Sequence, residues 1–74
     1  ACVQISAPVK SVYRWKGRVS TSREVQLWIK TETRLFKKVA DQISALHPYE
    51  VPEILSISID RGLETYFKWM LNKE

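Results

Sequence analysis

The sequence predicts a small α+β domain in which helices cover one face of a mostly antiparallel sheet. Three observations support this class. Apolar and polar residues alternate along much of the first half of the chain, which is typical of strands, and apolar residues recur at three- and four-residue spacing in two later stretches, which is typical of helices. Gly17 provides a turn between two alternating runs. The predicted order is strand, strand, helix, strand, helix, within one domain spanning residues 1–74.

The first elements form a predicted hairpin. Residues 1–5 alternate, and a second run covers residues 9–16, with Pro8 at an edge or a bend because proline has no amide hydrogen for a central ladder. Lys16-Gly17-Arg18 is the predicted tight turn, since glycine supplies the positive φ that such a turn needs. After the polar residues 20–22, the returning strand is predicted over residues 24–31, with one apolar face toward the core.

A helix is predicted over residues 31–46, with a threonine hydroxyl as its cap and one apolar stripe. Pro48 prevents it from continuing. Residues 53–59 alternate again and predict a strand, joined to the hairpin by a right-handed crossover if the two strands are parallel. Residues 65–71 place apolar side chains at helical spacing and predict a short closing helix.

The size of the chain favours self-association. A chain of 74 residues buries only about 60% of its unfolded surface, so contacts between copies would add stability. Trp28 lies on the polar face of the returning strand, where a tryptophan is unusual in a monomer and common at the centre of an interface. We therefore expect Trp28, and Trp69 in the closing helix, to lie between subunits.

Composition excludes several classes. A hydrophobic fraction of 45% is typical of a folded chain. No apolar run reaches the roughly 18 residues of a membrane span, and the first residues have no signal-peptide pattern, so we expect a cytoplasmic protein with no membrane partner. The single Cys2 fits a reduced compartment and cannot form an internal disulfide.

The stretch from Leu46 to Glu53 is the expected functional centre. It contains His47, the only histidine, together with two prolines, a tyrosine and two carboxylates. Each proline fixes its own φ and keeps the preceding residue extended, so the polar groups are held at fixed angles. The alternative is a rigid connector whose histidine is solvated or bonded to a neighbouring backbone group.

Metal binding is the chemistry that these residues favour. Imidazole and thiolate are ligands for copper and zinc, which makes His47 and Cys2 the candidate ligands. One chain supplies too few of them for a tetrahedral site, so a neighbouring chain, Glu50 or water would have to complete it. Catalysis is not expected: the chain has no nucleophile motif or phosphate loop, and Glu50 with Glu53 fits charge pairing or a strand cap better than acid and base work.

Nucleic-acid binding is the competing class. The hairpin combines basic residues with Tyr13 and Trp15. Alternation puts these aromatics on one face of their strand and Arg14 with Lys16 on the other, so stacking and phosphate contacts would not coincide. We therefore expect no nucleic-acid partner.

The chain resembles the CutA family of divalent-cation tolerance proteins. The resemblance runs through the whole chain in order, and its most specific parts are YRWKG at residues 13–17 and HPYEVPE at residues 47–53, supported by residues 1–3, 30–31 and 66–69. It implies a ferredoxin-like, PII-like fold, a homotrimer in which strands of neighbouring subunits pair, and a role in tolerance of copper and other divalent metals. Family members normally have a strand and a helix before the segment matching residues 1–3, so we expect the chain to be incomplete at its N-terminus. Some also have a histidine where this chain has Leu46, which weakens the case for a two-histidine site.

The resulting prediction is a homotrimer that binds copper or zinc weakly, without an obligatory cofactor and without turnover. Its metal ligands would be His47 and Cys2, with Trp28 and Trp69 at the trimer interface. The cleft between subunits would contain Tyr13, Trp15, Lys30, Tyr49, Glu50 and Glu53. The alternative is a trimeric scaffold or small-ligand signalling module with no direct metal role.

Overall fold

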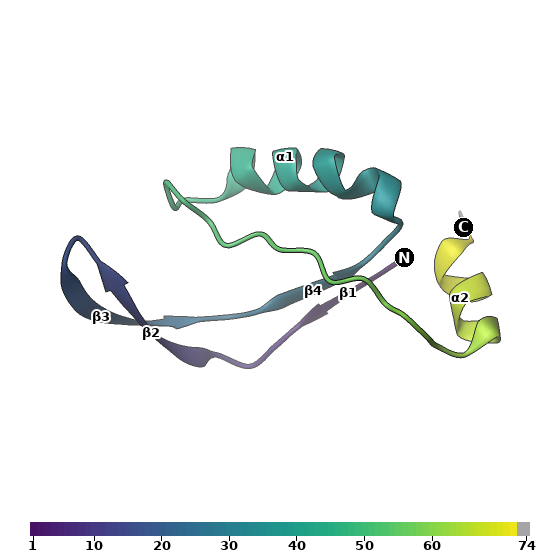
Figure 1. The fold of residues 1–74 in the computed structure, drawn as a ribbon, viewed down its shortest axis with the longest axis horizontal. Coiled ribbons are helices and arrows are strands. Elements are labelled where there is room, and N and C mark those ends of the chain that lie inside the picture. Colours follow the sequence, from purple (N-terminus) through teal and green to yellow (C-terminus); the bar gives the residue numbers. More distant parts are fainter. Residues whose placement is uncertain (73–74) are drawn as a thin grey trace.

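Strands occupy the first part of the chain and helices the second (Figure 1). The computed structural model describes residues 1–72. Its elements are β1 (Cys2–Ile5), β2 (Val9–Trp15), β3 (Arg18–Glu24), β4 (Leu27–Lys30), the 3₁₀ turn η1 (Thr33–Leu35), α1 (Phe36–Leu46) and α2 (Glu64–Leu71). Antiparallel strands with two helices confirm the predicted α+β class.

The four strands form one long hairpin that is divided into two ladders. β1 pairs with β4, and β2 pairs with β3 to give a two-stranded ribbon, residues 9–24. Between the ladders lies a joint at Pro8, where the amide of Ser6 donates to the carbonyl of Gln26 at 2.9 Å and the amide of Gln26 donates to the hydroxyl of Ser6 at 2.8 Å. The predicted strand over residues 24–31 is confirmed for β4, whereas Glu24 ends β3 instead. Residues 20–22, which were expected to precede the strand, belong to β3, because backbone pairing with β2 does not require apolar alternation.

The turn at the tip of the ribbon confirms the prediction from Gly17. Lys16 has φ 51° and Gly17 has φ 76°, so both central residues are left-handed. This conformation matches the right-handed twist of the flanking strands, and it sets the register in which Trp15 lies opposite Arg18.

α1 confirms most of the predicted helix but begins later, at Phe36 after the 3₁₀ turn. The predicted threonine cap was wrong: Leu35 is the N-cap residue of α1, and neither η1 nor α1 has a side-chain cap. At the other end His47 is extended, with ψ 138°, as expected for a residue before proline. Its amide still donates to the carbonyl of Ile43 at 2.8 Å and closes the last turn.

Residues 53–59 follow an extended path from α1 to α2 and belong to neither ladder of the described chain (Figure 1). The predicted strand and its crossover connection were therefore wrong. Their alternation suits a sheet, but a ladder also needs a neighbouring strand at hydrogen-bonding distance. Leu55 and Ile57 are consequently 79% and 75% exposed.

α2 confirms the predicted closing helix and lies at the end of the molecule away from the ribbon tip (Figure 1). The Ala1 nitrogen donates to the carbonyl of Met70 at 2.6 Å, which places α2 beside the start of β1. Gly62 precedes the helix and lies directly against the ring of Phe67, where a Cβ would overlap the ring.

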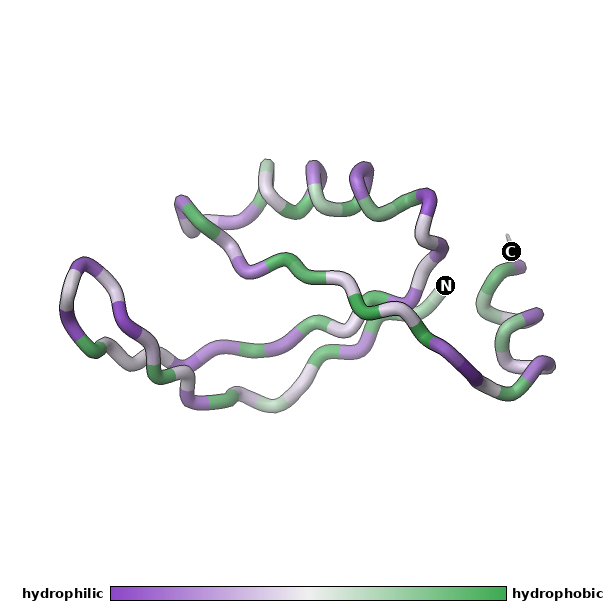
Figure 2. The backbone as a smooth tube through the Cα atoms, viewed as in Figure 1, coloured by the Kyte–Doolittle hydropathy of each residue, from purple (hydrophilic) through white to green (hydrophobic). Residues whose placement is uncertain are grey.

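Little of the described chain is buried. Met70 is its only buried hydrophobic residue, and Figure 2 shows hydrophobic positions spread along every part of the tube. The radius of gyration is 15.2 Å, whereas a chain of this length folded into one compact domain would have about 11 Å. The fold therefore presents most of its apolar surface outward.

Candidate functional site

The loop after α1 is held by its own histidine. The Tyr49 amide donates to Nδ1 of His47 at 3.0 Å, and the two rings lie 4.7 Å apart at a 60° tilt. Pro48 between them fixes the backbone that allows this bond. The geometry agrees with the alternative prediction for this loop, a rigid connector whose histidine is bonded to a neighbouring backbone group.

This loop contacts the ribbon through Glu24, the last residue of β3. A hydrogen bond from Ser11 lowers the pKa of the Glu24 carboxyl most, and a hydrogen bond from the Tyr49 phenol lowers this pKa further. The same contact raises the pKa of Tyr49, first through the hydrogen bond to Glu24 and then through its negative charge. Ser22 lies beside both side chains. We call Ser11, Ser22, Glu24, His47 and Tyr49 the Glu24 cluster.

Glu24 is the functional residue that the sequence prediction missed. From the sequence alone it is only the first residue of the predicted strand over residues 24–31. One signal could have identified it, because Glu24 is the sole carboxylate in a basic hairpin segment. The register of the ribbon explains why Glu24 lies near Ser11. Glu24 is opposite Val9, Ser22 is opposite Ser11, and all four side chains are on one face of the ribbon.

The predicted cleft residues separate into two places within one chain. Tyr13 and Trp15 lie on the ribbon face of the Glu24 cluster and are about half exposed. Lys30 lies at the end of β4 instead, where its Nζ donates to the Tyr66 hydroxyl at 3.3 Å and lies 5.5 Å from the centre of that ring. A single chain therefore does not bring Lys30 to the loop.

The remaining predicted residues are exposed or separated from the cluster. Glu50 and Glu53 lie on the surface, and neither forms an ion pair within residues 1–72. Trp28 and Trp69 are 52% and 57% exposed, as an interface role requires. Arg18, opposite Trp15, adds a cation to the aromatic face, which alternation along one strand did not predict.

The two candidate metal ligands are not together in one chain. Cys2 is half-buried in β1 opposite Lys30, whereas His47 belongs to the loop on the ribbon. Within residues 1–72, no three histidine, cysteine or acidic side chains gather closely enough to hold a metal ion.

The hydrogen bond to Tyr49 also affects how His47 can bind a metal. Nδ1 accepts a hydrogen bond, so in the neutral ring the hydrogen is on Nε2. A metal at Nε2 would require the other tautomer and would break this bond, and a metal at Nδ1 would displace the amide. The arrangement therefore makes metal binding compete with the loop conformation.

Comparisons with known proteins agree on one family. A family model described as CutA1 divalent ion tolerance protein matches residues 1–73. The divalent-cation tolerance protein CutA of Thermus thermophilus is 43% identical over 70 residues, which cover 95% of this chain and 68% of that protein. A CutA homolog of Danio rerio is 37% identical over 70 residues but is covered for only 47% of its length, so the chain spans less than half of that relative.

Solved structures of relatives share the fold. The Thermus thermophilus protein has a TM-score of 0.90 at 41% identity, and a PII-like protein CutA from Nostoc in apo form has 0.86 at 38% identity. Each comparison covers 95% of this chain and 68% of the other. These matches confirm the family resemblance and the PII-like fold.

Location stays a prediction. No helix within residues 1–72 is long and apolar enough to cross a membrane. Relatives carry different location names: the protein from Arabidopsis thaliana is called chloroplastic, and the one from Archaeoglobus fulgidus, with a TM-score of 0.90, is called periplasmic.

Proposed function

The chain belongs to the CutA1 divalent ion tolerance family, and from this premise we propose that it acts by binding, as a cytoplasmic homotrimer of single-domain subunits with weak affinity for copper or zinc between subunits. One observation carries the proposal: the described chain leaves most of its large apolar side chains exposed. Its single imidazole also favours a site that several copies share.

Self-association is supported by the exposed apolar side chains. Trp28 and Trp69 are each more than half exposed, which is costly for an isolated small domain. Symmetric assembly would bury them at repeated interfaces. We place Trp28 and Trp69 in the trimer interface.

Metal binding is supported by ligand chemistry and by the names of the relatives. Copper and zinc prefer imidazole and thiolate, and each copy contributes His47 and Cys2. A site completed by a second copy needs only one or two ligands per chain. Because the metal competes with the Tyr49 hydrogen bond, weak affinity is expected and no resident cofactor is required.

The proposed role is binding without turnover. The Glu24 cluster uses its carboxylate to hold the loop, and Cys2 is not placed beside His47 as a nucleophile beside its base would be. The cleft between subunits would contain Tyr13, Trp15, Tyr49, Glu50 and Glu53, together with Lys30 from another copy.

Calorimetric titration with copper and zinc tests the metal role. We expect His47→Ala to lose most of the affinity and Cys2→Ser to lose less, because only His47 lies in the loop at the proposed cleft. Lys38→Ala is the matched control, since Lys38 is exposed on α1. Equal affinity in the parent protein and His47→Ala would rule out the metal role.

A trimeric scaffold or small-ligand signalling module is the second candidate. It is favoured by the fact that Nδ1 of His47 is already used within the chain. Under this alternative, His47→Ala would leave metal affinity unchanged while Trp28→Ala would reduce the mass measured by light scattering. A trimeric mass for Trp28→Ala would contradict the interface assignment.

A further inference from the structure

The ribbon carries the whole net charge of the chain. Its residues 9–24 include Lys10, Arg14, Lys16, Arg18 and Arg23 but only one carboxylate, Glu24. The other basic and acidic residues balance, so the formal charge of +4 belongs to this segment. Within residues 1–72, none of these five cations makes an ion pair.

The two faces of the ribbon differ. One face contains the Glu24 cluster with Tyr13 and Trp15, and the chain's own loop contacts it through Tyr49. The opposite face we call the cationic face. It consists of Lys10, Val12, Arg14, Val19, Thr21 and Arg23.

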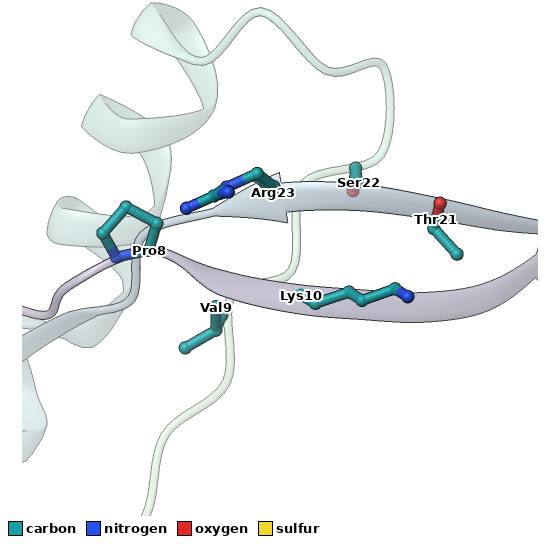
Figure 3. A pocket seen from close by; sticks show the side chains of 6 residues that line it. All are labelled: Pro8, Val9, Lys10, Thr21, Ser22 and Arg23. Atoms are coloured by element: carbon teal, nitrogen blue, oxygen red, sulfur yellow. The ribbon is translucent and has the colours of Figure 1, made fainter.

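Within the part of the chain that the structure describes, no acidic side chain pairs with the cationic face. Lys10 lies directly opposite Arg23, and like charges in such a pair destabilise a ladder unless something neutralises them. Figure 3 shows these two side chains extending in different directions along the ribbon. A hollow of about 620 Å³ lies beside them, lined by Pro8, Val9, Lys10, Thr21, Ser22 and Arg23.

The loop offers a complementary charge pattern. Four carboxylates form ion pairs, Glu24 accepts hydrogen bonds, and Glu50 and Glu53 are the two acidic residues within residues 1–72 that do neither. Val51 between them is 69% exposed. The order acid, apolar, acid along residues 50–53 thus matches the order cation, apolar, cation along Lys10, Val12 and Arg14 on the ribbon.

Dimensions allow the two patterns to meet. Lys10 and Arg14 are about 13 Å apart along the strand, and residues 50 and 53 are at most about 10 Å apart in an extended chain. Long lysine, arginine and glutamate side chains span the difference. Within residues 1–72, no carboxylate pairs with a cation of this face, and the loop's Tyr49 lies beside Glu24 on the opposite face of the ribbon.

We infer that residues 50–53 of one copy dock on the cationic face of the next copy. This inference rests on the proposed self-association and names the residues that each copy contributes. The contact is heterologous, since the ribbon of each copy meets the loop of another, and a threefold ring closes it. Glu50 and Glu53 then neutralise Lys10, Arg14 and Arg23, while Val12 covers Val51.

Charge reversal tests this contact, with mass measured by light scattering. We expect Lys10→Glu with Arg23→Glu to give a monomer at a concentration where the parent protein is trimeric, and Glu50→Lys with Glu53→Lys to do the same. The chain with all four substitutions should recover the trimer. Mixing the two reversed proteins should not restore the trimer. A ring of three that contains both kinds of subunit always has one contact between two subunits of the same kind, and in that contact the charges repel.

Lys38→Glu and Asp60→Lys are the matched controls, because both positions are exposed and lie outside the contact. They should leave the mass unchanged. Circular dichroism of each variant separates loss of assembly from loss of fold. A trimer that persists in both reversed proteins would overturn the docking contact while leaving the homotrimer in place, whereas a monomeric parent protein would overturn both.

The same variants would also reveal a polyanion, and not a second copy of the chain, as the partner of the cationic face. If the ribbon reversal abolishes binding of a single-stranded oligonucleotide or of polyphosphate and the mass stays trimeric, the face binds an external polyanion and our inference is wrong. Assembly through the proposed contact should weaken with added salt, because the charge pairs are partly exposed.

Discussion

The two ladders of the hairpin differ in what they face. The β1–β4 ladder pairs apolar side chains such as Val3 with Ile29 and connects to α1, whereas the β2–β3 ribbon pairs Lys10 with Arg23 and Ser11 with Ser22. They share one backbone architecture, so the difference comes from side chains alone. One hairpin thus supplies a ladder beside the helices at one end and a charged, largely polar ribbon at the other.

The largest expected change in the free energy of unfolding is at Gly62, beside α2 at the end of the molecule away from the ribbon tip. Gly62→Ala should destabilise the protein by up to about 2 kcal/mol, because the added Cβ overlaps the far end of the Phe67 ring and the ring must leave its position. Urea unfolding measures this free energy. Adding Phe67→Leu should recover part of the loss by removing the ring. If Gly62→Ala alone is as stable as the parent protein, α2 does not pack as described.

The ribbon tip should respond less. Gly17 has φ 76° and nothing within 4 Å of the position that a Cβ would take, so Gly17→Ala meets only backbone strain, about 1 kcal/mol. Gly17→Asn is the matched variant, because asparagine tolerates this conformation. Urea unfolding should rank the parent first, Gly17→Asn second and Gly17→Ala last. A loss at Gly17→Ala larger than at Gly62→Ala would reverse the contrast between the two ends.

The smallest effect is the pH dependence of the contact between loop and ribbon. The pKa of folded Glu24 is lowered, so its stabilising contribution is fully present above its ordinary value of 4.5 and is lost as the pH falls through the lowered pKa. The pKa of folded Tyr49 is raised above 10.0, so its contribution is present below that value and lost as the pH rises through the raised pKa.

Urea unfolding over a range of pH checks both directions. Glu24→Gln should flatten the acidic part of the curve, and Tyr49→Phe should flatten the alkaline part. Charge reversal at Lys38 provides a control for net charge. An acidic dependence that Glu24→Gln leaves intact would assign it to another carboxylate.

The sequence predicts local features of this fold well, since residues close in the chain determine them. Gly17 identifies the turn, Pro48 the end of α1, and helical spacing the position of α2. The division of the hairpin at Pro8 was only suggested as an edge or bend. It could not be located from alternation, because the polar β3 looks like a loop when its partner strand is unknown.

The candidate site was predicted only where its residues are close in the chain. His47 and Tyr49 are neighbours whose contact follows from the intervening proline, whereas Glu24 reaches Tyr49 only through the register of the ribbon. Residues 53–59 show the limit most clearly. Their alternation indicates a strand, but a ladder forms only if a second strand lies beside it, and the alternation does not identify that strand.

The ribbon extends from the joint at Pro8 as a two-stranded arm. Its seven residues per strand extend about 23 Å from the joint, so a rotation of about 10° there moves the tip by about 4 Å. The bonds between Ser6 and Gln26 resist that rotation across a break in the ladder. A rotation of this size, caused by substitution of either residue, would displace Tyr13 and Trp15 by several ångströms.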